Sequence, residues 1–325
     1  MCKSARRCVA PGLLAAAFFH ADAVPAQNYP ARPIRVIIPW GTGGSTDAVI
    51  RILMPKMAES LGQQIIVDNR PGGVSVVGLD AVAKSPPDGY TVGVSTISFS
   101  VNPFMLNKMP FDTEKDLLPV SQITEVPTVL VIHPSVPARS VKELVAVAKA
   151  NPGRLNYGSS GNGTVNHLAA ELFSSLTGIK MVQVPYKSGG FAVVSIMAGE
   201  TALQFATIPS ALSHIKSGRL VALGVSSARR DPTLPAIPTI AEAGLPGFEV
   251  NEWQGLLVPA GTSRAIITRL HQETVKSLAL PEVKERITAV GAHVVGSTPE
   301  EFAVFIRKEL STWSRVTRDA GIRAD

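Results

Sequence analysis

The sequence contains very little cysteine. Its two cysteines, Cys2 and Cys8, both lie within the first ten residues. The rest of the chain therefore has no disulfide framework, no thiolate nucleophile and no thiolate ligand for a metal ion. Aromatic residues make up 6% and charged residues 17% of the chain, but 45% of its 325 residues are hydrophobic. That apolar content provides for a core and excludes a mainly disordered protein.

Long hydrophobic runs and blocks of one charge are also missing. No stretch reaches the roughly 18 uninterrupted apolar residues that a membrane-spanning helix needs. The formal net charge of +6 is spread along the chain, without a long block of Lys and Arg. A dispersed positive charge does not form the basic patch that is typical of nucleic-acid binding. We therefore expect neither a membrane anchor nor a nucleic-acid partner.

Residues 1–26 have the three parts of a secretory signal peptide. A positively charged start is followed by an eleven-residue apolar stretch, Val9 to Phe19, and then by small residues, with cleavage expected after Ala23 or Ala26. Eleven residues at ~1.5 Å each span about half of a bilayer core, which favours export over anchoring. Cleavage after Ala26 would leave a soluble, cysteine-free chain with 28 basic and 24 acidic residues.

Short β-rich runs alternate with longer helical patterns, which predicts an α/β fold with mostly parallel sheets. The expected strands are 34–38, 64–67, 91–95, 126–133, 155–157, 182–184, 202–205, 220–225 and 249–258. The expected helices include 50–61, 74–84, 141–150 with Ser140 as its cap, 168–176, 193–198, 209–217 and a tail around 302–313. Pro55 predicts a kink or an interruption in the first of these helices.

Two loops rich in glycine and hydroxyl groups each connect an expected strand to an expected helix. They are Trp40–Asp47 and Tyr157–Thr164. Glycine lets the backbone approach a ligand closely, and the following helix directs free N–H groups at the same place, so each loop is a candidate receptor for a carboxylate. The alternative is that both loops merely join strand to helix, with Ser and Thr as N-caps. Two such loops in two similar halves favour a ligand held between the halves.

The sequence contains no complete catalytic or nucleotide-binding motif. Residues 158–162 lack the final glycine of a nucleophile elbow, and residues 161–166 lack the last glycine of the dinucleotide fingerprint. His167 lies in no metal-binding pattern, so we interpret it as a structural or loop-supporting histidine. We predict that the protein is not an enzyme and that it binds no metal ion and no cofactor. An exported hydrolase with Ser159 or Ser160 as nucleophile and His167 as base stays open as an alternative.

Eight short motifs follow one another between about Tyr29 and Gly321. They are Tyr29–Ile34, Gly43–Asp47, Asn69–Gly73, Pro87–Tyr90, Tyr157–Gly161, His167–Ala169, Pro185–Lys187 and Pro238–Glu242. Together and in this order they resemble the periplasmic solute receptors of tripartite tricarboxylate transporters, also called the Bug or TctC-like family. The resemblance covers nearly the whole chain after the expected signal peptide.

The resemblance implies a Venus-flytrap fold of two α/β domains joined by two crossover strands. One discontinuous domain would hold residues 27–127 plus 250–325, and the other would hold residues 128–249. In the family, the loops that match 43–47 and 159–164 face each other and grip a carboxylate, partly through ordered water. The implied function is a periplasmic receptor that captures a small organic carboxylate in the interdomain cleft.

The two loops and the resemblance together define the expected binding residues. They are Trp40, Gly43, Gly44, Ser45, Thr46, Asp47, Ser159, Ser160, Gly161, Gly163, Thr164, His167, Tyr186 and Thr207. Asp47 is expected to order its own loop rather than to contact an anionic ligand directly. The implied partners are the membrane subunits of a tripartite tricarboxylate transporter, with the receptor itself a monomer. A sensor that reports to a membrane kinase would keep the same pocket and is the second alternative.

The second half departs from the family pattern. The family has a Phe-Asp pair where this chain has Phe205-Ala206, and Phe191 stands near a usual proline. Loss of the carboxylate predicts a ligand whose far end is less polar or bulkier. Trp40 and Phe191 are either pocket residues, which would suit an aromatic carboxylate, or core residues.

Overall fold

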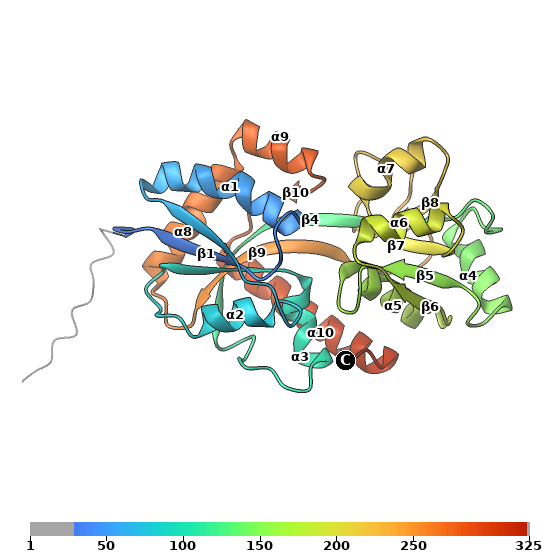
Figure 1. Ribbon diagram of the computed structural model, residues 1–325, viewed down its shortest axis with the longest axis horizontal. Helices are drawn as coiled ribbons and strands as arrows, with labels where there is room; N and C mark the ends of the chain where they lie inside the picture. The colour runs from blue at the N-terminus through green and yellow to red at the C-terminus, as the bar shows by residue number, and fades with distance from the viewer. Residues whose placement is uncertain (1–28, 324–325) are drawn as a thin grey trace, which may run out of the picture.

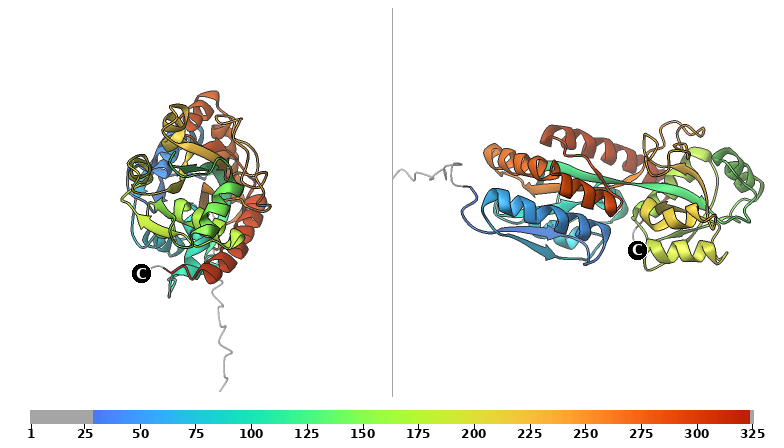
Figure 2. Two further views of the ribbon diagram at one scale, coloured as in Figure 1. Left: turned by 90° about the vertical axis from the view of Figure 1, so that its right-hand side faces the viewer. Right: turned by 90° about the horizontal axis from the view of Figure 1, so that it is seen from above.

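The computed structural model describes residues 29–323, and the predicted signal peptide, 1–26, lies outside them. The described chain forms two α/β lobes that lie side by side and are joined by long strands (Figures 1 and 2). The strands are β1 (Ile34–Ile38), β2 (Ile65–Asn69), β3 (Thr91–Ser95), β4 (Leu117–Ile132), β5 (Asn156–Ser159), β6 (Val182–Pro185), β7 (Leu203–Thr207), β8 (Val221–Val225), β9 (Asn251–Pro259) and β10 (His293–Val294). The helices are α1 (Ser45–Leu61), α2 (Val76–Ala83), α3 (Ile97–Met105), α4 (Val141–Ala150), α5 (Val165–Thr177), α6 (Gly189–Met197), α7 (Ile208–Lys216), α8 (Arg264–Leu278), α9 (Pro281–Ala289) and α10 (Pro299–Ala320).

Each lobe is built on its own part of one continuous sheet. In the first lobe the strand order is β2-β1-β3-β9-β4-β10, and in the second it is β8-β4-β7-β5-β6. We call these parts lobe 1, with α1–α3 and α8–α10, and lobe 2, with α4–α7. Strand β4 carries the chain from lobe 1 into lobe 2, and β9 begins the return path (Figure 1). This arrangement confirms the predicted α/β fold with two crossover strands. The prediction of mostly parallel sheets was wrong, because the crossover strands β4 and β9 pair antiparallel with all of their neighbours.

The strand β4 changes partners between Pro127, which pairs with β9, and Thr128, which pairs with β7. The domain bounds at 127/128 and 249/250 stay a prediction. The expected strand 126–133 was too short, because β4 begins at Leu117 and its first half carries Pro, Ser and Gln residues that hide the strand pattern.

Strand direction brings the loops of interest to one place. Strands β1, β2 and β3 are mutually parallel, and β3 runs antiparallel to β9, so all three point toward lobe 2. Strands β5, β6 and β7 are also parallel, and β7 runs antiparallel to β4, so they point toward lobe 1. The carboxyl ends of both strand sets therefore face each other across the junction of the lobes.

Local sequence signals explain several helix ends. The side chain of Ser140 accepts a hydrogen bond from the Glu143 N–H at the start of α4, as predicted. Helices α1 and α5 both end at a glycine in the left-handed conformation, Gly62 and Gly178, where a side chain would be strained. Of the two outcomes predicted for Pro55, an interruption was wrong, because α1 continues through the proline, held by buried residues on both sides of it, and a kink stays a prediction.

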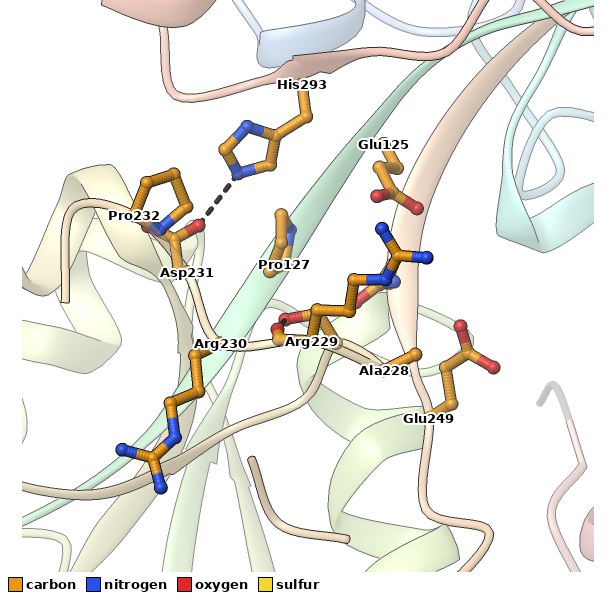
Figure 3. A pocket seen from close by; sticks show the side chains of 11 residues that line it. Glu125, Pro127, Ala228, Arg229, Arg230, Asp231, Pro232, Glu249 and His293 are labelled. Atoms are coloured by element: carbon orange, nitrogen blue, oxygen red, sulfur yellow. Dashed lines mark hydrogen bonds and ion pairs between the residues drawn. The ribbon is translucent and has the colours of Figure 1, made fainter. Parts of the chain in front are cut away.

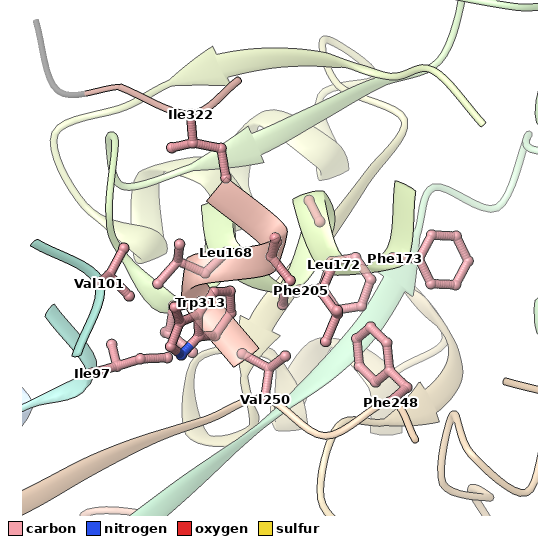
Figure 4. Packing of buried hydrophobic residues seen from close by; sticks show 14 of the residues in the cluster. Ile97, Val101, Leu168, Leu172, Phe173, Phe205, Phe248, Val250, Trp313 and Ile322 are labelled. Atoms are coloured by element: carbon pink, nitrogen blue, oxygen red, sulfur yellow. The ribbon is translucent and has the colours of Figure 1, made fainter. Parts of the chain in front are cut away.

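An apolar seam joins the two lobes on one side. Ile97 and Val101 of α3 and Trp313 of α10 lie in the same buried cluster as Leu168 and Leu172 of α5 (Figure 4). Helix α10 belongs to lobe 1 in its first turns and reaches beneath lobe 2 at its end (Figure 1). The lobes are thus connected by packed side chains as well as by strands. Among the described helices, none combines the length and the apolar character needed to cross a bilayer.

Candidate functional site

The loop after β1 is shaped by the carboxylate of Asp47. This side chain accepts hydrogen bonds from the backbone N–H of Gly43, from Arg51 Nε and from Asn69 Nδ2, each at 3.0 Å. Asn69 also donates to the backbone oxygen of Trp40 at 3.0 Å. Asp47 is buried, and its partners occupy both carboxylate oxygens, so it orders the loop in the way expected of it.

The electrostatics of Asp47 follow from these contacts. Burial raises the pKa of Asp47, but hydrogen bonds from Arg51, Gly43 and Asn69 outweigh burial and hold the pKa below its usual value. The guanidinium group of Arg51 forms an ion pair with Asp47, which neutralises its charge. The loop therefore presents backbone groups, not a free cation, to a ligand.

The remaining residues of this loop divide by exposure. Gly43, Gly44 and Ser45 are exposed, whereas Thr46 is buried at the start of α1. Gly44 is the N-cap of α1, so the first N–H groups of the helix point out of this loop without partners inside the helix. The Trp40 side chain is partly buried and packs against the core of lobe 1.

The loop after β5 is held by its own hydroxyl groups. The Ser159 Oγ accepts hydrogen bonds from Gly161 N at 3.2 Å and from Gln183 Nε2 at 2.8 Å. Thr164 donates from Oγ1 to the Gly161 oxygen at 2.7 Å. Gly161 and Gly163 have φ values of +109° and +71°, a backbone region that only glycine occupies without strain. Two of the sequence-predicted glycines are thus required by the shape of the loop.

His167, in the first turn of α5, supports this loop through a hydrogen bond. Its Nδ1 accepts a hydrogen bond from Gly163 N at 3.2 Å, so that nitrogen carries no proton. Burial lowers the pKa of His167 to about 4, which keeps the imidazole neutral at neutral pH. Its Nε2 lies 4.0 Å from an oxygen of Glu171, whose own pKa is raised by burial. The geometry matches the loop-supporting interpretation of His167.

The hydrolase alternative lacks its nucleophile–base pair in the described hydrogen bonds. Ser160 Oγ donates to Asn166 Oδ1 at 2.8 Å rather than to His167. Ser159 Oγ is fully buried and takes its hydrogen bonds from Gly161 and Gln183. A serine activated by a base would need a hydrogen bond to that base.

The second loop touches lobe 1 at Gly163. The Ser98 Oγ of α3 donates to the Gly163 oxygen at 3.4 Å. A Cβ at Gly163 would lie 3.1 Å from Met105 Cε and 3.4 Å from Val74 Cγ1. The sequence did not reveal α3, since its residues are buried on nearly every side and follow no helical period. The approach of this helix to the second loop is a part of the site that sequence reasoning missed.

Tyr186 and Thr207 lie at the same edge of lobe 2 as the second loop. The Tyr186 N–H donates to the Ser159 oxygen at 2.8 Å, directly after β6. Thr207 ends β7 and is the N-cap of α7, with its Oγ1 3.0 Å from Ser210 Oγ. Phe191 is 59% exposed on α6, so it is not a core residue. Within residues 29–323, no three His, Cys, Asp or Glu side chains gather in a way that could hold a metal ion.

Comparison with known proteins adds family evidence to this geometry. A family model described as "Tripartite tricarboxylate transporter family receptor" matches residues 49–322. Protein BugT of Bordetella pertussis is 39% identical over 302 residues, which cover 92% of this chain and 93% of BugT. A protein encoded in the tcbD-tcbE intergenic region of Pseudomonas sp. is 37% identical over 91% of this chain and 89% of its own length.

Solved structures resemble the chain over its described length. The periplasmic binding protein BugD superimposes with a TM-score of 0.76 at 28% identity, covering 91% of this chain and all of BugD. A structure from R. palustris with adipate gives a TM-score of 0.78 at 32% identity, covering 91% of this chain and 99% of that one. MatC from Rhodopseudomonas palustris with bound malate gives a TM-score of 0.75 at 30% identity, covering 89% of this chain and 99% of MatC. These likenesses confirm the predicted Venus-flytrap fold.

Proposed function

Because the chain belongs to the tripartite tricarboxylate transporter receptor family, we propose that it is a periplasmic receptor that captures a small organic carboxylate between its lobes. The observation that carries the proposal is the opposition of two glycine loops at the carboxyl ends of parallel strands in both lobes. Ligands of open α/β sheets bind at such ends. The expected binding residues of each lobe therefore lie on the edge that faces the other lobe.

Backbone N–H groups supply the recognition chemistry in this proposal. The first turn of α1 follows Gly44, and the first turn of α5 follows Thr164, so each loop directs unpaired helix N–H groups and the positive end of a helix dipole at the cleft. Arg51 is already neutralised by Asp47. A carboxylate would thus be bound by dipoles from both lobes, which favours a closed arrangement because each lobe contributes contacts only when the other is near.

The solved relatives suggest the ligand class. Two of them were solved with adipate and with malate, which are linear dicarboxylates. In this chain Ala206 is buried where the family pattern has a carboxylate, so the far wall offers no acidic group at that position. We include a dicarboxylate in the proposal because of these two relatives, whereas the missing acidic group favours a ligand whose far end is less polar or bulkier. The membrane subunits of a tripartite transporter are the proposed partner of the closed form.

Calorimetric titration with adipate and malate, supported by thermal shifts over a panel of carboxylic acids, tests the proposal. We expect at least one acid to bind and small-angle scattering to show compaction at saturation. Gly161→Val should reduce affinity at least tenfold, since valine is strained at φ +109° and the loop must change shape. Gly44→Val should also block binding, but by its bulk, because Gly44 has an ordinary φ of −79°.

Gly199→Val provides the matched control. Gly199 has a φ of +76°, and a Cβ added to it, as to Gly161, would meet no atom within 4 Å, but it lies in the turn between α6 and β7 at the opposite edge of lobe 2. The Gly199→Val protein should lose stability without losing affinity. Absence of binding across the acid panel, or normal affinity in both Gly44→Val and Gly161→Val, would contradict the proposal.

A further inference from the structure

An ion pair joins the lobes on the side opposite the apolar seam. The Nε2 of His293 lies 2.7 Å from Oδ2 of Asp231 (Figure 3). His293 lies in β10, which pairs with β4 at Glu125 in lobe 1. Asp231 lies in the loop after β8 in lobe 2. The contact therefore crosses from one lobe to the other close to the crossover strands.

Asp231 is fixed within lobe 2. Its Oδ1 accepts hydrogen bonds from the backbone N–H of Thr233 at 2.8 Å and from the hydroxyl group of Thr233. Its side chain is only 2% exposed. With Oδ1 occupied from its own loop, Oδ2 is the oxygen that meets His293. A buried carboxylate held in this way loses much of its stabilisation when its charged partner moves away.

The surroundings keep His293 accessible to protons. Its side chain is 30% exposed and borders a cavity of about 290 Å³. Glu125, Arg229 and Glu249 face the same cavity, and Arg229 extends between the two glutamates (Figure 3). Arg230 points away and pairs with Glu242. Glu125 adds a weaker negative field at His293.

The lobes are in close contact beside this pair. Gly291, which precedes β10, packs against Pro209 at the start of α7, and a Cβ on Gly291 would lie 1.7 Å from Pro209 Cγ. Such tight packing leaves no room for small adjustments. Because His293 is held in lobe 1 and Asp231 is held in lobe 2, a rotation of the lobes changes the distance between the two side chains.

We propose that His293 and Asp231 form a pH-sensitive latch that holds the lobes in the arrangement described here. When His293 is protonated the latch is a charged pair, and when His293 is neutral the attraction weakens and other lobe arrangements gain population. This inference rests on the proposed function, because it adds pH as a regulator of the lobe movement that would trap a ligand.

The direction of the pH effect follows from the pair. The hydrogen bond and charge of Asp231 raise the pKa of His293 above its usual value, in spite of partial burial. The pKa of Asp231 is lowered, since hydrogen bonds from His293 and Thr233 outweigh the effect of burial, which would raise it. The latch is therefore at full strength below the usual histidine pKa of about 6.5 and is lost as the pH rises through the raised pKa of His293.

Distance measurements on the ligand-free protein test the latch separately from ligand binding. Spin labels at Lys216→Cys on α7 and Lys284→Cys on α9, both exposed, with Cys2 and Cys8 replaced by serine, report the separation of the lobes by pulsed electron spin resonance. Between pH 5.5 and pH 8.5 we expect the ratio of the described arrangement to other arrangements to fall about fivefold.

Variants identify the groups responsible. His293→Gln should show the high-pH distribution at both pH values, and His293→Lys, which keeps a positive charge, should show little change with pH. His133→Gln is the matched control, since His133 bonds Ser135 within lobe 2 and its loss should leave the wild-type response intact. An unchanged distribution in the wild type, or an unchanged pH response in His293→Gln, would overturn the latch whatever the ligand proves to be.

Discussion

At the scale of single residues, the two glycine loops are supported in the same way. In each loop a side chain from the first turn of the following helix accepts the N–H of a glycine four residues earlier: Asp47 accepts from Gly43, and His167 accepts from Gly163. One acceptor is a buried anion paired with Arg51, and the other is a buried neutral imidazole. The loops are therefore shaped by the protein's own groups, which would lower the entropic cost of the binding proposed above.

Replacing Asp47 tests the first support. Asp47→Asn should lower the free energy of unfolding by about 1–2 kcal/mol, because the charge-assisted hydrogen bond from Arg51 is lost and the other bonds weaken. Urea unfolding measures the difference, with the exposed Asp319→Asn as a control that should stay near zero.

The same variant predicts a pH profile. The folded-state pKa of Asp47 lies below its value in the unfolded chain, so its contribution is complete above about pH 4 and disappears as the pH falls through the folded pKa. A difference between wild type and Asp47→Asn that persisted undiminished at pH 2 would argue against a role for the charge.

Replacing His167 tests the second support. The pKa of His167 is about 4 in the folded protein and about 6.5 in the unfolded chain. Between pH 4 and pH 6.5 the unfolded chain therefore binds a proton at this residue that the folded protein does not bind. The free energy of unfolding should therefore fall by about 3 kcal/mol from this residue alone as the pH drops from 7 to 4. His167→Gln should remove that slope in urea titrations at several pH values, whereas equal slopes in both proteins would show that the pKa of His167 does not differ between the folded and the unfolded state.

At the scale of elements, the sequence predicted those strands and helix ends that depend on residues adjacent in the chain. The strand 34–38, the cap at Ser140 and the stop at Gly178 follow from local chemistry, and all three are present. Helix α3 did not follow, because it is buried on nearly every side and contains Pro103, so no period marks it. The pairing of β3 with β9 joins Gly93 to Leu257, a distance along the chain that no local pattern reports.

The candidate site divides in the same way. The two loops are visible in the sequence because glycine, serine and threonine lie between a strand and a helix. Their facing edges depend on strand direction and on the crossover of β4, which the sequence supplied only through the family resemblance. The pair His293–Asp231 joins residues 62 positions apart, one in a loop and one in a two-residue strand. No local sequence pattern therefore predicts it.

At the scale of the whole molecule, the apolar seam couples the lobes. Trp313 of α10 is buried in a cluster that also holds Leu168 and Phe205 of lobe 2 (Figure 4). Residues that share one core tend to unfold together, even when they belong to different lobes. The seam thus makes the two lobes one thermodynamic unit, while the latch on the opposite side affects their relative position.

Calorimetry measures this coupling. We expect the protein to unfold in a single thermal transition, and Trp313→Ala to lower its midpoint through a loss of about 3–5 kcal/mol. Val304→Ala, at a 59% exposed position of the same helix, should change little. Two separate transitions in the wild-type protein would show that the seam does not join the lobes energetically.

The path of the chain also sets an order for folding. Strands β5 to β8 and helices α4 to α7 all lie between residues 141 and 225, so lobe 2 assembles from neighbouring segments. Lobe 1 cannot complete its sheet until β9, at residues 251–259, has arrived to fill the place between β3 and β4. Contacts that close long loops form slowly. When the chain emerges N-terminus first, β3 therefore keeps an unfilled edge until β9 arrives, and such an edge favours aggregation.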